Sequence, residues 1–85
     1  MKVKVLYFAR LRELFNLESE VLEFPGEQVY AAAVIDFLRK RGEPWATELG
    51  LDAGNRMAVN QTLAGIVTPV KDGDEVAIFP PVTGG

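Results

Sequence analysis

Residues 2–9 have the sequence KVKVLYFA, in which two lysines alternate with valines before the chain becomes wholly apolar. A period of two is typical of a β-strand, and the apolar end indicates a strand that enters a covered part of a sheet. The segment therefore predicts a first β-strand. It lacks both the apolar core and the small-residue cleavage site of a secretion signal, so we expect the protein to stay in the cytoplasm.

Two shorter elements are predicted after this strand. Residues 10–16 space three apolar side chains at i, i+3 and i+4, which is one face of a short connecting helix. Residues 18–24 carry apolar side chains among glutamates and are followed by Pro25 and Gly26, a turn signal. They predict a second strand, which we expect to pair with the first as a hairpin.

Residues 27–41 form the longest periodic segment and predict the main helix. Its apolar side chains fall into two adjacent stripes, Val29, Ala33 and Phe37 beside Tyr30, Val34 and Leu38. Glu27 at the start and Arg39, Lys40 and Arg41 at the end suit the helix dipole, and Gly42 is the expected cap. The basic triplet has a second interpretation as a partner-docking patch, which the acidic composition disfavours.

Residues 43–55 predict a loop that contains one helical turn at residues 45–49. Trp45 lies in that turn. A tryptophan in so small a domain is more often a lid over the core than a platform for a ligand. We therefore expect Trp45 to cover the core.

The C-terminal third predicts three strands and a turn. The strands span residues 56–60, 63–67 and 75–79, and the turn spans residues 69–74. Asp72 and Asp74 flank a glycine as in a calcium loop, but the other oxygen ligands of such a loop are missing, so a plain turn is predicted. If Val76 and Ile78 are core residues, alternation puts Phe79 on the outer face, where it would form a contact surface.

Length and charge exclude several classes of protein. A chain of 85 residues forms one small domain, and no run of about 20 apolar residues predicts a membrane span. The net charge is -3, whereas nucleic acids and anionic membranes attract basic surfaces. We expect neither nucleic acid nor membrane as a partner.

The absence of two residue types limits the chemistry of the side chains. The chain has no cysteine and no histidine, which removes the usual thiol nucleophile, the usual acid–base group and the commonest zinc ligands. Its glycines are isolated except for Gly84 and Gly85, so there is no phosphate-binding loop. We expect no metal and no bound cofactor. The end of the chain is the best candidate for chemistry.

The order of these elements predicts an α+β fold of the β-grasp, or ubiquitin-like, type. A mixed five-stranded sheet would carry one main helix packed across it, with the first and last strands central and parallel. Residues 1–79 would form the domain. Residues 80–85 would form a flexible tail ending in two glycines.

Three segments resemble the small subunit of molybdopterin synthase: DGDEVAIFPPVTGG at residues 72–85, AVNQTL at residues 58–63 and KVLYFARLREL at residues 4–14. The similarity covers essentially the whole chain. It implies a sulfur carrier whose Gly85 carboxylate is adenylated by a ubiquitin-activator-like enzyme that uses ATP, and is then converted to a thiocarboxylate. The sulfur would go to cyclic pyranopterin monophosphate to form the dithiolene of molybdopterin. The resemblance further implies docking to the synthase large subunit in a heterotetramer.

The composition of the tail suits this role. Six extended residues reach roughly 20 Å, enough to enter the active site of another protein. Glycines at the tip leave room for close approach, and prolines stiffen the base. The alternative is a frayed terminus without function. The tail residues are Pro80, Pro81, Val82, Thr83, Gly84 and Gly85.

Three residues are predicted to dock partners. Phe79 follows from strand alternation, whereas Leu63 and Arg12 follow from the resemblance. Their alternatives are a core leucine and a solvated helix charge, respectively. Three other functions stay open: a sulfur carrier for thiamin thiazole synthesis, a modifier conjugated to lysine, and a plain β-grasp binding module.

Overall fold

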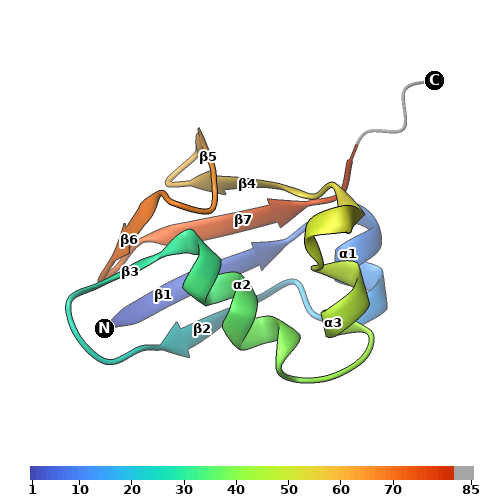
Figure 1. Ribbon diagram of the computed structural model, residues 1–85, viewed down its shortest axis with the longest axis horizontal. Coiled ribbons are helices and arrows are strands. Elements are labelled where there is room, and N and C mark those ends of the chain that lie inside the picture. Colours follow the sequence, from blue (N-terminus) through green and yellow to red (C-terminus); the bar gives the residue numbers. More distant parts are fainter. Residues whose placement is uncertain (82–85) are drawn as a thin grey trace.

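The computed structural model describes residues 1–81; residues 82–85 lie outside the described part (Figure 1). The elements, in chain order, are β1 (Lys2–Tyr7), α1 (Ala9–Phe15), β2 (Ser19–Glu23), β3 (Gln28–Tyr30), α2 (Ala31–Arg39), α3 (Trp45–Glu48), the 3-10 helix η1 (Leu51–Ala53), β4 (Arg56–Val59), β5 (Thr62–Ala64), β6 (Pro69–Lys71) and β7 (Glu75–Phe79).

The main sheet has the strand order β2-β1-β7-β4-β5. Its two central strands, β1 and β7, run parallel, and every other pair in this sheet is antiparallel. Helix α2 crosses one face of the sheet (Figure 1). This arrangement confirms the predicted β-grasp fold. The predicted pairing of the first two strands is confirmed too, although α1 lies between them in the chain.

The core lies between this sheet and α2. Alternate residues of the two central strands point into it, and α2 contributes one buried stripe from the other side. Each fully buried aliphatic side chain contributes about 1.5–3 kcal/mol to folding. The core side chains from these three elements, each no more than 1% exposed, are Val3, Val5, Tyr7, Val76, Ile78, Ala31, Val34 and Leu38.

The main helix is shorter than predicted. It begins at Ala31 instead of residue 27, because β3 precedes it and pairs with β6 in a separate two-stranded sheet. The first turn of α2 has no acidic residue, so the expected role of Glu27 at the helix start is wrong. The N–H groups of Ala31 and Ala32 donate instead to the carbonyls of Thr68 and Ile66, both at 2.9 Å. Backbone carbonyl oxygens from the loop between β5 and β6 thus satisfy the first free N–H groups of α2.

The buried stripe of α2 also differs in part from the prediction. Val34 and Leu38 are buried as expected, and Ala31 completes their stripe. Phe37 and Tyr30 are 42% and 55% exposed. Both predicted stripes were apolar, so periodicity alone could not decide which one faces the sheet.

Two further boundaries moved in the C-terminal third. The strand predicted for residues 63–67 is β5, which ends at Ala64, and the chain then turns from Gly65 to Thr68. Residues 69–71, predicted as a turn, are strand β6. The turn lies at Asp72 and Gly73, as expected for the rest of that segment.

Within residues 1–81, no helix combines the length and apolar character needed to cross a lipid bilayer.

Candidate docking face and tail root

The side of the main sheet opposite α2, which we call the open face, is the candidate docking surface. Directly paired residues of neighbouring strands point to the same face, so strand register defines a row of side chains across it. On four of the five strands these side chains are apolar and exposed or half-buried, whereas on the edge strand β2 the register ends at the half-buried Ser19. The apolar row consists of Leu63, Ala58, Ala77 and Leu6, from β5, β4, β7 and β1 respectively.

Two phenylalanines extend this row toward the tail. Phe79 pairs with Arg56 and lies two residues beyond Ala77, so it points to the open face, where it is half-buried. Phe8 has an extended backbone, and its N–H donates to the Ile78 carbonyl at 3.3 Å, which continues the β1–β7 pairing by one residue. Alternation from Leu6 puts Phe8 on the same face, 43% exposed.

The three sequence-predicted docking residues lie in two places. Phe79 and Leu63 share the open face, and Leu63 is 65% exposed, so it is not a core leucine. Arg12 is exposed on α1, which lies at the end of the sheet where β7 leads into the tail (Figure 1). These positions are compatible with docking, which stays a prediction for all three.

Sequence reasoning missed Phe8. Its signal was present in the alternation of residues 2–8, which puts Leu6 and Phe8 on the face opposite Val5 and Tyr7. The apolar end of this segment predicted a strand that enters a covered part of the sheet, and such a strand would have no aromatic residue facing outward.

The described part of the tail is its proline root. Pro80 is half-buried and Pro81 is exposed. Gly54 lies beside the root: a Cβ added to this glycine would be 3.8 Å from the Pro81 side chain. The four predicted tail residues Val82, Thr83, Gly84 and Gly85 lie outside the described residues.

An aromatic and ionic cluster connects β1, β2 and the three helices at the tail end of the sheet. The Tyr7 hydroxyl donates to Glu20 Oε2 at 2.6 Å, and Arg41 donates to both Glu20 carboxylate oxygens at 2.8 and 2.7 Å. The Arg41 guanidinium carbon lies 4.6 Å from the centre of the Trp45 ring. Trp45 in turn stacks on Phe15, with 3.7 Å between ring centres.

The ionisation of this cluster follows from its hydrogen bonds. Burial raises the pKa of Tyr7 far above its usual range, and the hydrogen bond to Glu20 acts in the same direction. Burial would raise the pKa of Glu20, but the hydrogen bonds from Arg41 and Tyr7 outweigh it and lower that pKa. The hydrogen bond to Glu20 raises the pKa of Arg41. Tyr7 therefore stays neutral, and Glu20 and Arg41 stay charged, at neutral pH.

These contacts bear on two predictions. Trp45 packs against the core, which confirms its assignment as a lid. Two residues of the basic triplet have partners within the domain: Arg41 binds Glu20, and Arg39 Nε donates to the Ala46 carbonyl at 3.0 Å. Arg39 and Arg41 therefore connect the end of α2 to α3 and β2, a role that dipole compensation alone did not predict.

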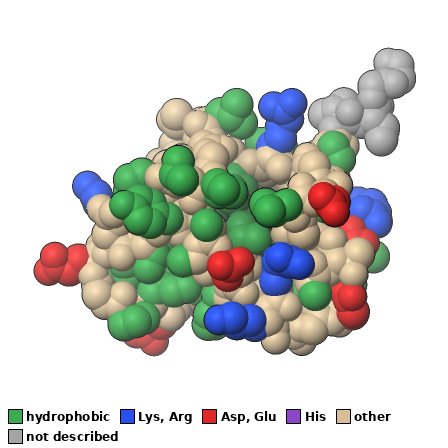
Figure 2. Space-filling model, in the orientation of Figure 1, with side chains coloured by type: hydrophobic (Ala, Val, Ile, Leu, Met, Phe, Trp, Pro, Cys, Tyr) green, Lys and Arg blue, Asp and Glu red, His purple; other side chains and the backbone are tan. Residues whose placement is uncertain are grey.

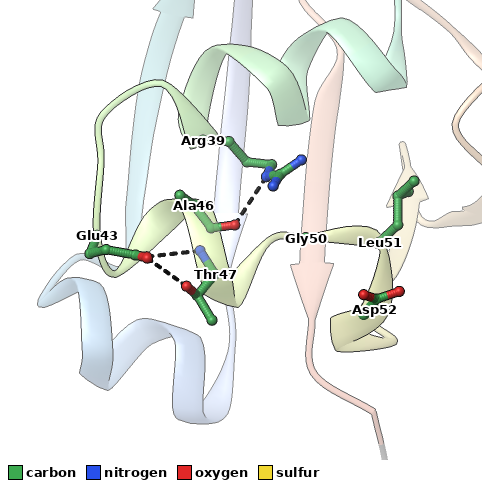
Figure 3. Close-up of a pocket in the computed structure, with 7 residues that line it drawn as sticks. All are labelled: Arg39, Glu43, Ala46, Thr47, Gly50, Leu51 and Asp52. Atoms are coloured by element: carbon green, nitrogen blue, oxygen red, sulfur yellow. Dashed lines mark hydrogen bonds between the residues drawn. The ribbon is translucent and has the colours of Figure 1, made fainter.

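A hollow of about 600 Å³ lies between the end of α2 and α3 (Figure 3). Three of its polar side chains, those of Arg39, Glu43 and Thr47, are engaged in local structure. Glu43 accepts hydrogen bonds from the Thr47 backbone N–H at 2.9 Å and from the Thr47 hydroxyl at 2.6 Å, which holds the start of α3, and Arg39 binds the Ala46 carbonyl. These bonds make this part of the hollow a structural connection between α2 and α3.

The described residues bring together no group of three carboxylate, histidine or cysteine side chains that could hold a metal ion. The groups on the open face can bury apolar area against another protein, and β7 leads directly from that face to the tail. The described residues therefore offer an apolar surface beside the tail root and no cluster suited to metal binding.

Known proteins are similar to this chain over nearly its whole length. Residues 5–85 match the model of the ThiS family. Curated relatives from Haemophilus influenzae and Escherichia coli, both named molybdopterin synthase sulfur carrier subunit, are 44% and 42% identical. Each alignment covers 98% of this chain and 99% of the relative.

A solved structure shows the same fold in a complex. It is the protein–protein complex of subunits 1 and 2 of the molybdopterin-converting factor from Helicobacter pylori. The matching chain has a TM-score of 0.68 and 27% identity, and the match covers 100% of both chains. On these matches, the chain belongs to the ThiS family and, within it, to the molybdopterin synthase sulfur carrier subunits.

Proposed function

We propose that this protein carries sulfur on its C-terminal Gly85 and delivers it to the pterin precursor of molybdopterin while docked on the synthase large subunit. The observation that carries the proposal is the match to curated sulfur carrier subunits, which covers nearly their full length, and the match to the family model includes the tail to residue 85. The open face supports it, since this face is apolar across four strands and carries Phe79, the residue directly before the tail.

Activation of the tail requires a partner enzyme. A carboxylate is a poor acyl donor until one oxygen becomes part of a leaving group. Transfer of AMP from ATP to the Gly85 carboxylate, with release of pyrophosphate, would provide that leaving group. A sulfur nucleophile would then displace AMP and leave a thiocarboxylate. We propose a ubiquitin-activator-like adenylating enzyme as the partner for this step.

Delivery of sulfur requires a second partner. The thiocarboxylate is an anionic sulfur nucleophile that can attack a carbon of cyclic pyranopterin monophosphate and displace an oxygen substituent of that carbon, which leaves as water or as the opened phosphate. Hydrolysis of the resulting thioester would then leave the sulfur on the pterin as a thiolate and return the Gly85 carboxylate. Two such cycles supply the two sulfurs of the dithiolene. The large subunit would bind the pterin, and the complex of subunits 1 and 2 in the related structure supports such an assembly. We further propose that the two subunits form a heterotetramer in the cytoplasm.

Docking would use the open face and α1. Phe79, Phe8 and Leu63 are the exposed or half-buried apolar anchors, and such anchors dominate the energy of protein interfaces. Arg12 would add a charged contact at the edge. Because the same face adjoins the tail, a partner that covers it also receives the chain end.

The loading step is tested by intact mass spectrometry. The protein is incubated with ATP, a sulfide source and the adenylating enzyme of its own organism. We expect a gain of about 16 Da, because one oxygen is replaced by sulfur. A chain without Gly85 is the control and should not change. An unchanged mass while the same enzyme loads another carrier would contradict the proposal, and a covalent adduct with lysine would favour a protein modifier.

A further inference from the structure

Helix α1 cannot hold its position by itself. It has only seven residues, whereas isolated helices shorter than about 12–15 residues are marginal in water. Its N-cap is Phe8, which makes no side-chain capping bond, and its first turn has no acidic residue. One of its side chains, Leu11, is fully buried. Contacts with other elements must therefore fix its orientation.

Two contacts hold α1 to the core: Leu11 is buried, and Phe15 meets the Tyr7 ring edge to face at 5.4 Å. Two further contacts go to α3. Phe15, the last residue of α1, stacks on Trp45 with an interplanar angle of 8°. Arg10, in the first turn, forms a salt bridge with Glu48 at 2.8 Å, but this pair is largely exposed at Arg10 and worth little by itself. The stacked rings are thus the main contact between α1 and α3.

Trp45 is itself held from the side of α2. Arg41 lies over its ring, and Arg41 is fixed by two hydrogen bonds to Glu20. Glu20 accepts a third hydrogen bond from Tyr7, whose side chain is 1% exposed in the core. The rings of Tyr7 and Trp45 also meet edge to face at 5.6 Å. A continuous set of contacts therefore runs from the core to Trp45 and on to α1.

Helix α1 lies at the end of the sheet where β7 leads into the tail (Figure 1), and it presents side chains to solvent there. Arg12 and Leu14 are both exposed, Leu14 by 42%, on opposite flanks of the helix. Trp45 lies on α3, away from the open face, and has no place in the docking row. We propose that Trp45, clamped between Phe15 and Arg41, is a positioning residue that sets the orientation of α1 for docking to the synthase large subunit. This inference rests on the proposed function.

The test measures sulfur transfer from purified, already thiocarboxylated carrier to the pterin precursor, catalysed with the large subunit. Trp45→Ala should raise the KM for the carrier about tenfold and leave kcat unchanged, because docking is weakened while the reacting end of the chain is intact. Trp45→Phe keeps a stacking ring and should restore most of the loss.

A matched variant separates positioning from stability. Val34→Ala leaves a cavity under α2, away from α1, and should destabilise the fold by about 2 kcal/mol, an amount similar to the loss in Trp45→Ala. All assays are run at a temperature where circular dichroism shows every variant folded. Val34→Ala should then have the KM of the original protein. Amide exchange in α1 should accelerate in Trp45→Ala and stay unchanged in Val34→Ala.

Two results would overturn the inference. One is an unchanged KM in Trp45→Ala although its α1 amides exchange faster, which would show that docking does not depend on α1. The other is an equal rise in KM in Val34→Ala, which would show that loss of stability alone explains the rise in Trp45→Ala. Failure of the proposed function is distinct, because the unaltered protein would then neither accept sulfur nor support transfer.

Discussion

The two ends of the main sheet are held together in different ways. At the end away from the tail, turn residues bind the backbone: Asn60 Oδ1 accepts from the Glu75 N–H, and Asp74 accepts from Asn60 Nδ2 and the Lys71 N–H, all at 2.8–2.9 Å. At the tail end, aromatic rings and two ion pairs, Arg41–Glu20 and Arg10–Glu48, join segments far apart in the chain. At the end away from the tail, these polar groups bond to one another within the domain. The tail end instead presents apolar side chains and the tail root at the surface.

This difference suggests a division of labour. The polar end can fix the register of the sheet without touching a partner. The tail end carries the surface that a partner would bury, so changes there should affect docking and transfer more than stability.

Removal of Gly85 should have the largest effect. It shortens the chain by about 3.5 Å, and a misplacement of even 1 Å at a reacting centre can cost about 100-fold in rate. Sulfur loading should therefore fall at least about 100-fold, measured as the initial rate of thiocarboxylate formation. Lys71→Ala, at the other end of the sheet, should load normally. Equal loss in both variants would contradict the division.

Phe79→Ala should weaken binding to the large subunit by about 2 kcal/mol, or roughly 30-fold in Kd, as expected for an aromatic anchor. Isothermal titration calorimetry would measure the effect. The control is Val21→Ala, since Val21 is 62% exposed on the same face but lies on the edge strand β2. We expect it to change the affinity by less than about 0.5 kcal/mol. An equal loss of affinity in both variants would show that the binding free energy is not concentrated in the residues near the tail.

Asn60→Ala should lower the free energy of unfolding by about 1–2 kcal/mol and leave the affinity unchanged. The variant removes two hydrogen bonds and places alanine at a φ of 49°. Urea titration measures the loss. Gln61→Ala is the control, because Gln61 also has a positive φ, 68°, and makes no side-chain bond within the described residues. Reduced affinity in Asn60→Ala would mean that the polar end takes part in docking.

The Glu20–Arg41 pair predicts a small pH effect on stability. The pKa of Glu20 is lower in the folded protein than its ordinary value of 4.5. Its contribution is therefore fully present above about pH 4.5 and lost as the pH falls through the folded pKa. Because the pair is only partly buried, the loss should be about 1 kcal/mol. The measurement is the free energy of unfolding from urea titrations at a series of pH values. Glu20→Gln should reduce the fall in this free energy at acidic pH, and an unchanged pH dependence would exclude the Glu20–Arg41 pair as its cause.

The part of the structure that could be predicted from sequence depends mainly on local patterns. Alternation in residues 2–9 and 75–79 predicted the central strands and the outward direction of Phe79. Strand β3 could not be predicted this way, since its pairing with β6 brings together residues about 40 positions apart. The stacking of Phe15 on Trp45 is equally non-local. Both arise from tertiary packing, which periodicity does not encode.

The candidate site divides in the same way. The chemistry of the tail could be inferred from what the chain lacks, since without cysteine and histidine few other groups can react. The sequence could not decide whether Leu63 lies in the core or on the surface. Its position on the open face, where it is 65% exposed, becomes clear only from the register of β5 against β4. Phe8 was missed because it lies in a run of five apolar residues, 5–9, in which the alternation between the two faces of the strand cannot be recognised.

The central claim is that Gly85 gives up its sulfur only in the docked complex. The most direct test follows the intact mass of the thiocarboxylated carrier in a single turnover with the large subunit, the pterin precursor, or both. We expect the mass to fall by about 16 Da, back to the carboxylate, only when both are present, while sulfur appears in the pterin. A carrier that keeps its sulfur under these conditions, or loses it equally without the large subunit, would contradict the account.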